Sequence, residues 1–324
     1  MKVSVIIPIY NAEKYIGQCA QSLFSQTQRD IEYIFVNDAS TDASLLVLGD
    51  VLSAFPERKE QTIILDNEIN KGPSFTRNRG LDISSGDYIA FCDADDFVHP
   101  HAYERMLKAA ISSQAEMVAC GVLVNDGKTE LLFDKNFSLC FSKKVDCQEI
   151  EGALYSSLWN KLIRRDLFVN NHIRFNDNLW MWDDLYVVFQ LRYYCKRDII
   201  INEPLYQYVA NNASITHSNR FTKSQSQIKC SELLELFFSD KVDRLRYRHI
   251  LSFLKFHSKN LLFTNEYIHI WLSCFPETHR DILLFRQFYG YARIIRYLIV
   301  IVLKESGWKL LNRYSSIKKF IIKK

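Results

Sequence analysis

The chain has 324 residues, of which 48% are hydrophobic and 24% charged, enough apolar content to bury a large core and to exclude a disordered polypeptide. Its formal net charge is +4, but residues 286–324 carry ten Lys and Arg and one acid, which leaves a net charge of −5 on residues 1–285. A basic tail on an acidic body argues against a nucleic-acid-binding protein and favours contact of the tail with an anionic surface.

Cysteine spacing and the amino terminus give two further expectations. The eight cysteines include no CxxC pair, so the sequence indicates neither a zinc site nor a redox motif. The first residues lack the long apolar segment and the small-residue cleavage site of a secretory signal. We expect a cytoplasmic protein with reduced thiols, held peripherally on the inner face of the cell membrane if its basic tail meets lipid.

The first hundred residues alternate between strand and helix patterns. Short apolar runs predict strands at residues 3–7, 31–36, 62–65 and 88–91. Amphipathic spacing predicts helices at residues 14–25 and 42–54, and Gly72-Pro73 opens a third helix, since proline suits the first turn. This βαβ series predicts an α/β fold in which helices cover both faces of a mostly parallel sheet.

Polar residues follow three of these strands, at Tyr10-Asn11, Asn37-Asp38 and Asp93-Ala94-Asp95-Asp96. Because ligands bind beyond the carboxyl ends of parallel strands, we expect the three clusters to converge at one edge of the sheet. Three carboxylates within four positions repel one another, and a divalent cation relieves that repulsion most simply at the end of a buried strand. The sequence therefore predicts a metal site beside a phosphate-bearing ligand.

The rest of the chain suggests a second domain. Residues 117–141 show strand patterns, and helical spacing returns at 147–155 and 183–194. Beyond residue 220 the chain is rich in Leu, Phe, Tyr and Ile at helical spacing, and its longest uncharged apolar run, 297–303, is too short to span a membrane. We predict an α/β domain at residues 1–220 that carries the site and a helical, basic region at 221–324.

The basic region contains an amphipathic segment. Apolar side chains fall along one helical face, namely Phe288, Tyr291, Ile294, Ile295, Leu298 and Val302. Basic side chains lie between or beside them, namely Arg286, Arg293, Arg296 and Lys304. Such a helix can lie in the headgroup plane of an anionic membrane. A helix that packs on its own domain and keeps a solvated basic side is the alternative.

Four motifs occur in order along the first hundred residues. They are Val3-Ser4-Val5-Ile6-Ile7-Pro8-Ile9-Tyr10-Asn11, Val36-Asn37-Asp38-Ala39-Ser40-Thr41-Asp42, Gly72 through Thr76-Arg77-Asn78, and Phe91-Cys92-Asp93-Ala94-Asp95-Asp96. In order and spacing they resemble the inverting family 2 glycosyltransferases with the GT-A fold, of the type that makes bacterial surface polysaccharides. The resemblance continues through Trp159-Asn160-Lys161, Asp183-Asp184, Tyr206-Gln207-Tyr208 and Ser214-Ile215-Thr216. It implies a Rossmann-like GT-A domain over residues 1–220, with a helical appendage.

The resemblance assigns residues to the nucleotide end of a donor site. It implies that Tyr10 stacks on the base, that Asp38 accepts a hydrogen bond from a uracil-type ring nitrogen, and that Pro8 also contacts the donor. Family members usually have glycine at the position of Ala39, so the turn here must tolerate a Cβ. Asp42 is assigned first to capping the following helix.

The resemblance also assigns the diphosphate end. Arg77 matches an arginine near the diphosphate, where a guanidinium offers two parallel donors, whereas Arg79 lies on a different helix face. The acidic run resembles the DXD motif, which implies that Asp93 and Asp95 contact the donor and that Asp95 and Asp96 hold Mn²⁺ or Mg²⁺.

The acidic pair Asp183-Asp184 resembles an element of the family whose second acid is the general base. Asp184 would then take the proton of the acceptor hydroxyl as its oxygen attacks the anomeric carbon. The alternative is that both acids only stabilise the start of the following helix through its dipole.

Taken together, the resemblance implies a metal-dependent inverting glycosyltransferase of the hexosyl or N-acetylhexosaminyl type. The expected donor is a nucleotide-diphospho-sugar, with UDP as the expected carrier, and the expected acceptor is a hydroxyl of a glycan or a lipid-linked oligosaccharide. The expected partners are these two substrates and an anionic membrane surface, without nucleic acid. Two alternatives stay open, a phosphatase or nucleotidyltransferase that uses the acidic cluster, and a non-catalytic nucleotide-sugar-binding scaffold at a membrane.

Overall fold

The computed structural model describes residues 1–124, 130–132, 156–209 and 219–322. Contacts divide the chain into two compact units, one of Met1–Val145 with Glu149–Ser214 and one of Asp146–Gln148 with Ile215–Lys324. Of the strand patterns predicted over residues 117–141, residues 125–129 and 133–141 lie outside the described residues, as do the predicted helix at 147–155 and the motif at 214–216.

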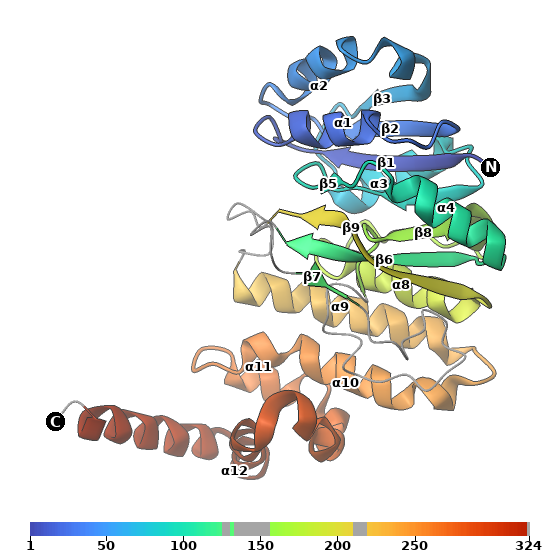
Figure 1. Ribbon diagram of the computed structural model, residues 1–324. Coiled ribbons are helices and arrows are strands. Elements are labelled where there is room, and N and C mark those ends of the chain that lie inside the picture. Colours follow the sequence, from blue (N-terminus) through green and yellow to red (C-terminus); the bar gives the residue numbers. More distant parts are fainter. Residues whose placement is uncertain (125–129, 133–155, 210–218, 323–324) are drawn as a thin grey trace. The chain divides into compact units, whose positions relative to one another are not determined.

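A mixed sheet forms the centre of the first unit (Figure 1). Over the described residues it has nine strands, in the order β3-β2-β1-β4-β8-β6-β9-β5 with β7 beside β6. These are β1 (Val3–Ile9), β2 (Ile31–Asn37), β3 (Thr62–Asp66), β4 (Tyr88–Phe91), β5 (Phe97–Val98), β6 (Met117–Val124), β7 (Glu130–Leu131), β8 (Lys161–Arg164) and β9 (Asp198–Tyr208).

Strand direction changes at the middle of this sheet. The first four strands pair in parallel, as the alternating pattern predicts. Beyond them, β8 runs antiparallel to both β4 and β6. Strand β5 pairs antiparallel with β9 and β7 pairs antiparallel with β6, whereas β6 and β9 pair in parallel. The parallel half aligns the carboxyl ends of β1, β2 and β4, because Ile9 pairs with Asn37 and Ile6 with Phe91.

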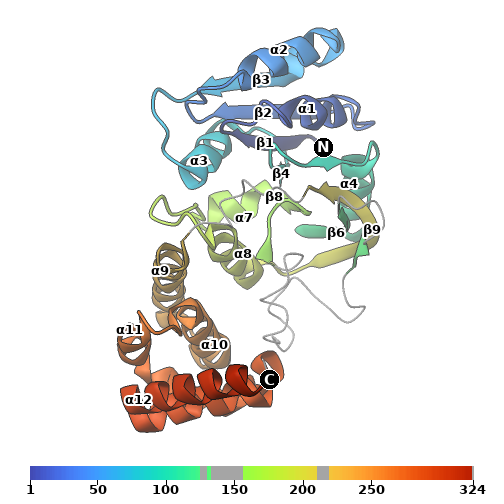
Figure 2. The ribbon, with the colours of Figure 1, turned by 90° about the vertical axis from the view of Figure 1, so that its left-hand side faces the viewer.

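Helices cover both faces of the sheet, which explains why every residue of β2 is buried. Figure 2 shows α1 and α4 on one face and α3 and α8 on the other. The helices of this unit are α1 (Ile16–Phe24), α2 (Ser44–Ser53), α3 (Pro73–Ile83), α4 (Ala102–Ser113), α7 (Arg165–Asn170) and α8 (Asp183–Tyr194), with a 3-10 turn η1 (Pro56–Gln61). The predicted α/β fold is confirmed.

The helix α3 begins where the sequence predicts. Gly72 adopts a φ of 85°, a conformation that favours glycine, and Pro73 occupies the first helical turn. The Gly72 amide donates to Oδ2 of Asp38 at 2.7 Å, so the end of β2 holds the start of α3. This contact orients the helix that carries Arg77.

The second unit is helical, as the sequence predicts for the region beyond residue 220. Its elements are α9 (Arg220–Ser239), η3 (Arg244–Tyr247), α10 (Arg248–Ser258), η4 (Asn260–Leu262), α11 (Ile268–Ser273), η5 (Pro276–Phe285) and α12 (Arg286–Ile322). Aromatic side chains fill its core: Tyr297 stacks on Trp271 at 5.6 Å and meets Phe256 and Phe263 edge to face at 5.2 and 4.7 Å. This packing gives the unit a core of its own.

The long element α12 is kinked at two residues, Gly290 and Lys304, which have non-helical backbone angles. Between the kinks it packs Ile294, Tyr297 and Val300 into the unit. The sequence groups Ile294 with Tyr291, Ile295 and Val302 on one helical face, but the structure separates them, because Ile294 is buried and the other three are exposed. No helix in the described part of the chain is long and apolar enough to cross a membrane.

Candidate active site

The acidic loop after β4 separates its carboxylates into different environments. Asp96 is 1% exposed, and its two oxygens accept hydrogen bonds from the Tyr206 hydroxyl and the Val209 amide, both at 2.7 Å. Burial, with a contribution from the nearby charge of Asp93, raises the pKa of Asp96 to about 8. Asp93 and Asp95 keep partly exposed side chains. Asp96 therefore anchors the loop, while its two neighbours face the solvent side.

Arg77, on α3, joins this loop to the acidic pair at the start of α8. Its Nη2 lies 3.0 Å from Oδ1 of Asp93, and its Nη1 lies 2.7 Å from Oδ2 of Asp183. Nη1 also lies 3.7 Å from Oδ1 of Asp184. One guanidinium thus brings together the two acidic motifs, which are about ninety positions apart in the sequence.

Only one of the two carboxylate oxygens of Asp184 accepts a hydrogen bond from the described residues. Oδ2 accepts a hydrogen bond from the Leu158 amide at 3.1 Å, whereas Oδ1 is buried and has no hydrogen-bond partner among the described residues. Burial raises the pKa of Asp184 to about 7; Arg77 opposes the shift, and Asp183 and Asp93 add to it. A carboxylate with a free lone pair and a pKa near neutrality suits a proton acceptor.

A buried polar layer supports this region from β8. Lys161 is fully buried, and its Nζ donates to the Ser157 carbonyl at 2.5 Å and to Oδ1 of Asn160 at 2.8 Å. Burial lowers the pKa of Lys161 to about 7, and the nearby charge of Arg192 lowers it further. These contacts give Lys161 a structural role in this layer.

Two tyrosines of β9 complete the wall beside the acidic loop. Tyr206 stacks on Trp159 with ring centroids 4.6 Å apart, and Tyr208 stacks on the same indole at 5.9 Å. The Tyr206-Gln207-Tyr208 motif is visible in the sequence, but the hydrogen bond from the Tyr206 hydroxyl to Asp96 was not predicted. Alternate residues of a strand share one face, so the spacing of the two tyrosines was an available signal for a shared partner.

At the other end of the same sheet edge, Asp38 holds a loop together. It is 3% exposed and accepts hydrogen bonds from Nδ2 of Asn67 at 2.7 Å, from the Lys71 amide at 2.9 Å and from the Gly72 amide at 2.7 Å. An ionised carboxylate offers about four lone-pair sites, so one remains for a further donor. Asp38 is therefore both a loop anchor and a candidate ligand for a base.

Tyr10 and Pro8 lie next to this anchor at the end of β1. Tyr10 is 54% exposed, which leaves its ring open to a planar partner, and Pro8 is partly exposed. Ala39 has a φ of 57°, so the turn does place a Cβ in a backbone region that favours glycine. The loops after β1 and β2 are tied by a hydrogen bond from the Thr41 amide to Oδ1 of Asn11 at 2.8 Å.

Two residues that the sequence set apart from the site have other partners. Oδ1 of Asp42 accepts a hydrogen bond from the Ser44 amide at 3.0 Å, at the first residue of α2, as expected of a capping side chain. Nη1 of Arg79 donates to the Asp66 carbonyl at 2.7 Å and also bonds Asn67. Arg79 therefore braces the end of β3, away from the acidic pair that Arg77 contacts.

A divalent cation fits this arrangement only with help from a ligand. The described residues contain no group of three or more His, Cys, Asp and Glu side chains placed to hold a metal ion. Mg²⁺ is commonly bound by one or two carboxylates together with substrate phosphates. The partly exposed Asp95 and Asp93 can supply such a pair, although one oxygen of Asp93 already contacts Arg77.

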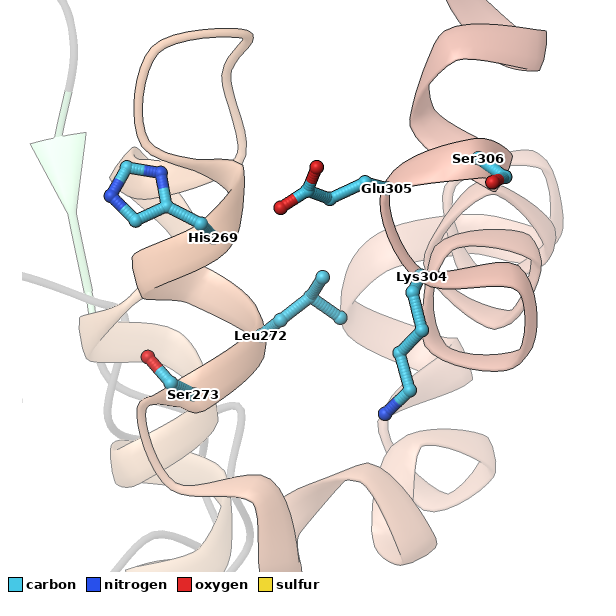
Figure 3. Close-up of a pocket in the computed structure, with 6 residues that line it drawn as sticks. All are labelled: His269, Leu272, Ser273, Lys304, Glu305 and Ser306. Carbon is cyan, nitrogen blue, oxygen red and sulfur yellow. The ribbon is translucent and has the colours of Figure 1, made fainter.

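A separate hollow of about 480 Å³ lies in the second unit. Figure 3 shows it between α11, which contributes His269, Leu272 and Ser273, and the kink of α12, which contributes Lys304, Glu305 and Ser306. All of its polar side chains are exposed, so water competes for their hydrogen bonds. The carboxylates of the first unit are the better candidates for chemistry.

Comparison with known proteins agrees with the fold and the motifs. The sequence model described as Glycosyl transferase family 2 matches residues 4–186, more than half of the chain. The Escherichia coli protein described as the uncharacterized glycosyltransferase YibD is 28% identical over 277 residues, which cover 80% of this chain and 76% of that protein.

Two solved structures share the fold. S. aureus TarS in complex with UDP-GlcNAc superposes with a TM-score of 0.72 at 19% identity, over 95% of this chain and 92% of that chain. The mannosyltransferase PcManGT from Pyrobaculum calidifontis, in complex with GDP-Man and Mn²⁺, gives a TM-score of 0.56 at 15% identity, over 99% of this chain and 84% of that chain. The predicted GT-A architecture is thereby confirmed, and with the family match it shows that the chain is a glycosyltransferase that belongs to glycosyl transferase family 2.

Proposed function

We propose that the protein transfers a sugar from a UDP-sugar to a hydroxyl of a glycan or lipid-linked oligosaccharide in surface-polysaccharide synthesis, with inversion and with a divalent cation. The observation that carries the proposal is the contact of Arg77 with Asp93 and Asp183, 3.7 Å from Asp184. The guanidinium of Arg77 thus lies beside both Asp93, the proposed donor-side carboxylate, and Asp184, the proposed proton acceptor. The UDP-GlcNAc complex of TarS, a protein of the same fold, supports UDP as the carrier.

The nucleotide would lie along the ends of β1 and β2. Tyr10 offers an exposed ring to the base, and Asp38 offers its remaining lone pair to a ring nitrogen that carries hydrogen, as uracil does. Pro8 lines the same end of β1. The diphosphate then extends toward the acidic loop, where Asp93 and Asp95 would meet the donor.

The metal assignment favours Asp95. Both oxygens of Asp96 already accept hydrogen bonds in a buried place, which suits support of the loop better than the ligand role that the resemblance implies for it. When bound, a cation such as Mn²⁺ or Mg²⁺ would offset the charge that develops on the leaving diphosphate. The Mn²⁺ complex of PcManGT supports a metal in this fold.

Asp184 is the proposed base. Its unpartnered Oδ1 would accept the hydroxyl proton while the acceptor oxygen forms a bond to the anomeric carbon and the bond to UDP breaks on the opposite side. A single displacement of this kind inverts the configuration. Arg77 holds the base relative to Asp93, so we assign it a positioning role before any contact with phosphate.

The test is Asp184→Asn. We expect transfer, measured as acceptor-dependent release of UDP from the sugar donor, to fall by at least about a hundredfold, because general-base catalysis contributes about that much. Binding of UDP with Mn²⁺, measured by calorimetry, should change little. The matched control is Asp166→Asn, which removes an exposed acid from the first turn of α7 and should leave both quantities unchanged.

Two outcomes would count against the assignment. Loss of UDP affinity in Asp184→Asn would make Asp184 a donor-site residue, and unchanged transfer would remove it from the chemistry. A phosphatase would hydrolyse a simple phosphomonoester without acceptor and would lose that activity on Asp93→Asn alone. A scaffold would bind UDP yet turn over nothing.

A further inference from the structure

One helix of the second unit has two apolar faces, and only one of them is packed. Between its kinks, α12 buries Ile294, Tyr297 and Val300 in the unit. Four other apolar side chains of this segment are large and well exposed: Tyr291 at 74%, Ile295 at 55%, Val302 at 72% and Leu303 at 48%. These four residues are called the outer face.

The outer face is continuous along the helix. At about 100° per residue, Tyr291, Ile295 and Val302 fall within about 40° of one another, and Leu303 lies about 100° from Val302, at the edge of this row. Exposed apolar residues are normal when scattered singly, but a contiguous row on one helix marks an interaction surface.

The charges around the outer face indicate what covers it. Arg293 and Arg296 are exposed on the same helical segment, and Lys304 and Lys309 follow it. The guanidinium of Arg293 lies over the rings of Tyr289 and Tyr297, at 5.4 and 5.8 Å, on the packed side of the helix, because Tyr297 is fully buried; Arg296 is the arginine nearer the outer face. Residues 286–324 contain only one acid, Glu305. An apolar row with basic neighbours is complementary to an anionic lipid surface.

A second copy of the chain fits this face less well. A two-fold contact would place the same patch against itself and bring the arginines of both copies together, without acids to pair them. We propose that the outer face of α12 inserts among the headgroups of an anionic phospholipid bilayer, with Arg296 and Lys309 on the lipid phosphates and the helix parallel to the surface.

The test is co-sedimentation of the full-length protein with vesicles of phosphatidylcholine, with and without about one third phosphatidylglycerol. We expect binding to the anionic vesicles only, weaker at about 0.5 M than at about 0.05 M salt. The double variant Ile295→Glu with Val302→Glu should bind at least about tenfold more weakly, because two charges enter the apolar layer.

The matched control is Val242→Glu with Leu245→Glu, which adds the same two charges at exposed apolar residues outside α12 and should keep wild-type binding. The variant Arg296→Gln with Lys309→Gln tests the basic side and should lower binding to anionic vesicles. Thermal unfolding checks that each variant is folded. None of these measurements needs a donor or turnover, so their failure is separate from failure of the proposed activity.

Three results would overturn the proposal. The first is wild-type protein that stays in the supernatant with anionic vesicles. The second is equal binding by the Ile295→Glu, Val302→Glu variant and its control. The third is a dimer in sedimentation velocity that this variant dissociates, without any vesicle binding, which would assign the face to a second copy of the chain.

Discussion

Asp184 carries a prediction about pH. Burial raises its pKa to about 7, and a general base must be ionised to accept a proton. The proton is bound below that pKa and lost above it, so kcat/KM should fall as the pH is lowered through about 7 and level off above it. A pH profile of UDP release at low donor concentration measures this. A profile that is flat between about pH 5 and 9 would contradict the assignment.

Substitutions of the charged neighbours of Asp184 should shift the midpoint of that pH profile in opposite directions. Four charged groups face it, namely Arg77 from α3, Asp183 from α8, Asp93 from the acidic loop and Lys161 from β8. Arg77→Gln removes a cation that favours the ionised form, so the midpoint should rise by about 1 pH unit or more; Asp183→Asn removes a like charge, so it should fall.

Arg79→Gln is the control for this pair of variants, since the guanidinium of Arg79 forms its hydrogen bonds with Asp66 and Asn67 at the end of β3, not with the acidic pair. Its midpoint should stay at the wild-type value. Parallel shifts of Arg77→Gln and Asp183→Asn in one direction would show that the changes act through general loosening of the site and not through charge.

The carboxylates show what a sequence can and cannot reveal at this scale. The acidic run and the pair Asp183-Asp184 are visible as motifs because their members are adjacent in the chain. Their different roles are not visible in the sequence, since Tyr206, which bonds Asp96, lies 110 positions away, and Arg77, the cation beside Asp183, lies 106 positions away. Local spacing identifies the candidates, and distant neighbours assign the roles.

At the scale of elements, two glycines in helices predict opposite effects on stability. A Cβ on Gly80 in α3 would lie 2.4 Å from Cγ2 of Ile6 in β1, whereas a Cβ on Gly49 in α2 would meet nothing within 4 Å. Gly80→Ala should therefore lower the free energy of unfolding by about 1–3 kcal/mol. Gly49→Ala should raise it by up to about 1 kcal/mol, through helix propensity.

Urea unfolding of the two variants side by side measures this difference. A neutral Gly80→Ala would mean that α3 shifts away from β1 at little cost, and the contacts of Arg77 should then weaken with it. The pairing of these glycines separates packing against the sheet from the intrinsic preference of a helix for alanine.

Elements with local signals were predicted well, and elements with distant partners were not. The strands of the parallel half and the start of α3 follow from apolar runs, Gly72 and Pro73. The antiparallel half was not predictable from periodicity, because β8 is a four-residue strand inserted between β4 and β6 and its pairing with β4 spans 72 to 76 positions. Period-2 patterns indicate a strand but not its neighbour.

At the scale of the whole molecule, the two units have separate cores, and a ligand should distinguish them. Tyr297 is fully buried in the second unit and donates to Oδ1 of Asn260 at 2.7 Å. We expect Tyr297→Ala to destabilise that unit by about 3–5 kcal/mol, and UDP with Mn²⁺ to raise only the midpoint of the first unit.

Differential scanning calorimetry measures both effects in one protein. The expected result is two transitions, one lowered by the substitution and the other raised by the ligand. A single transition that responds to both would show that the two units unfold together.

The strand patterns stop near residue 220, where the sequence predicts that a second domain begins. The division of the apolar side chains of α12 between a packed and an exposed face was not predictable, since a helix with two apolar faces looks like one broad face in the sequence. Deletion of residues 286–324 would remove Tyr297 and Val300 from the core as well as the outer face. Point substitutions on the exposed side are therefore the sharper probe of membrane contact.

The threefold hydrogen bonding of Asp38 has a consequence for how donor preference can change. The same carboxylate that would read the base also fixes the turn leading into α3, through Lys71 and Gly72. A substitution of Asp38 that changed recognition of the base would therefore also loosen α3, the helix that carries Arg77. New nucleotide preferences in this lineage should therefore arise at Tyr10 and Ala39, whose side chains carry less of the scaffold, and Asp38 should be among the last positions to vary.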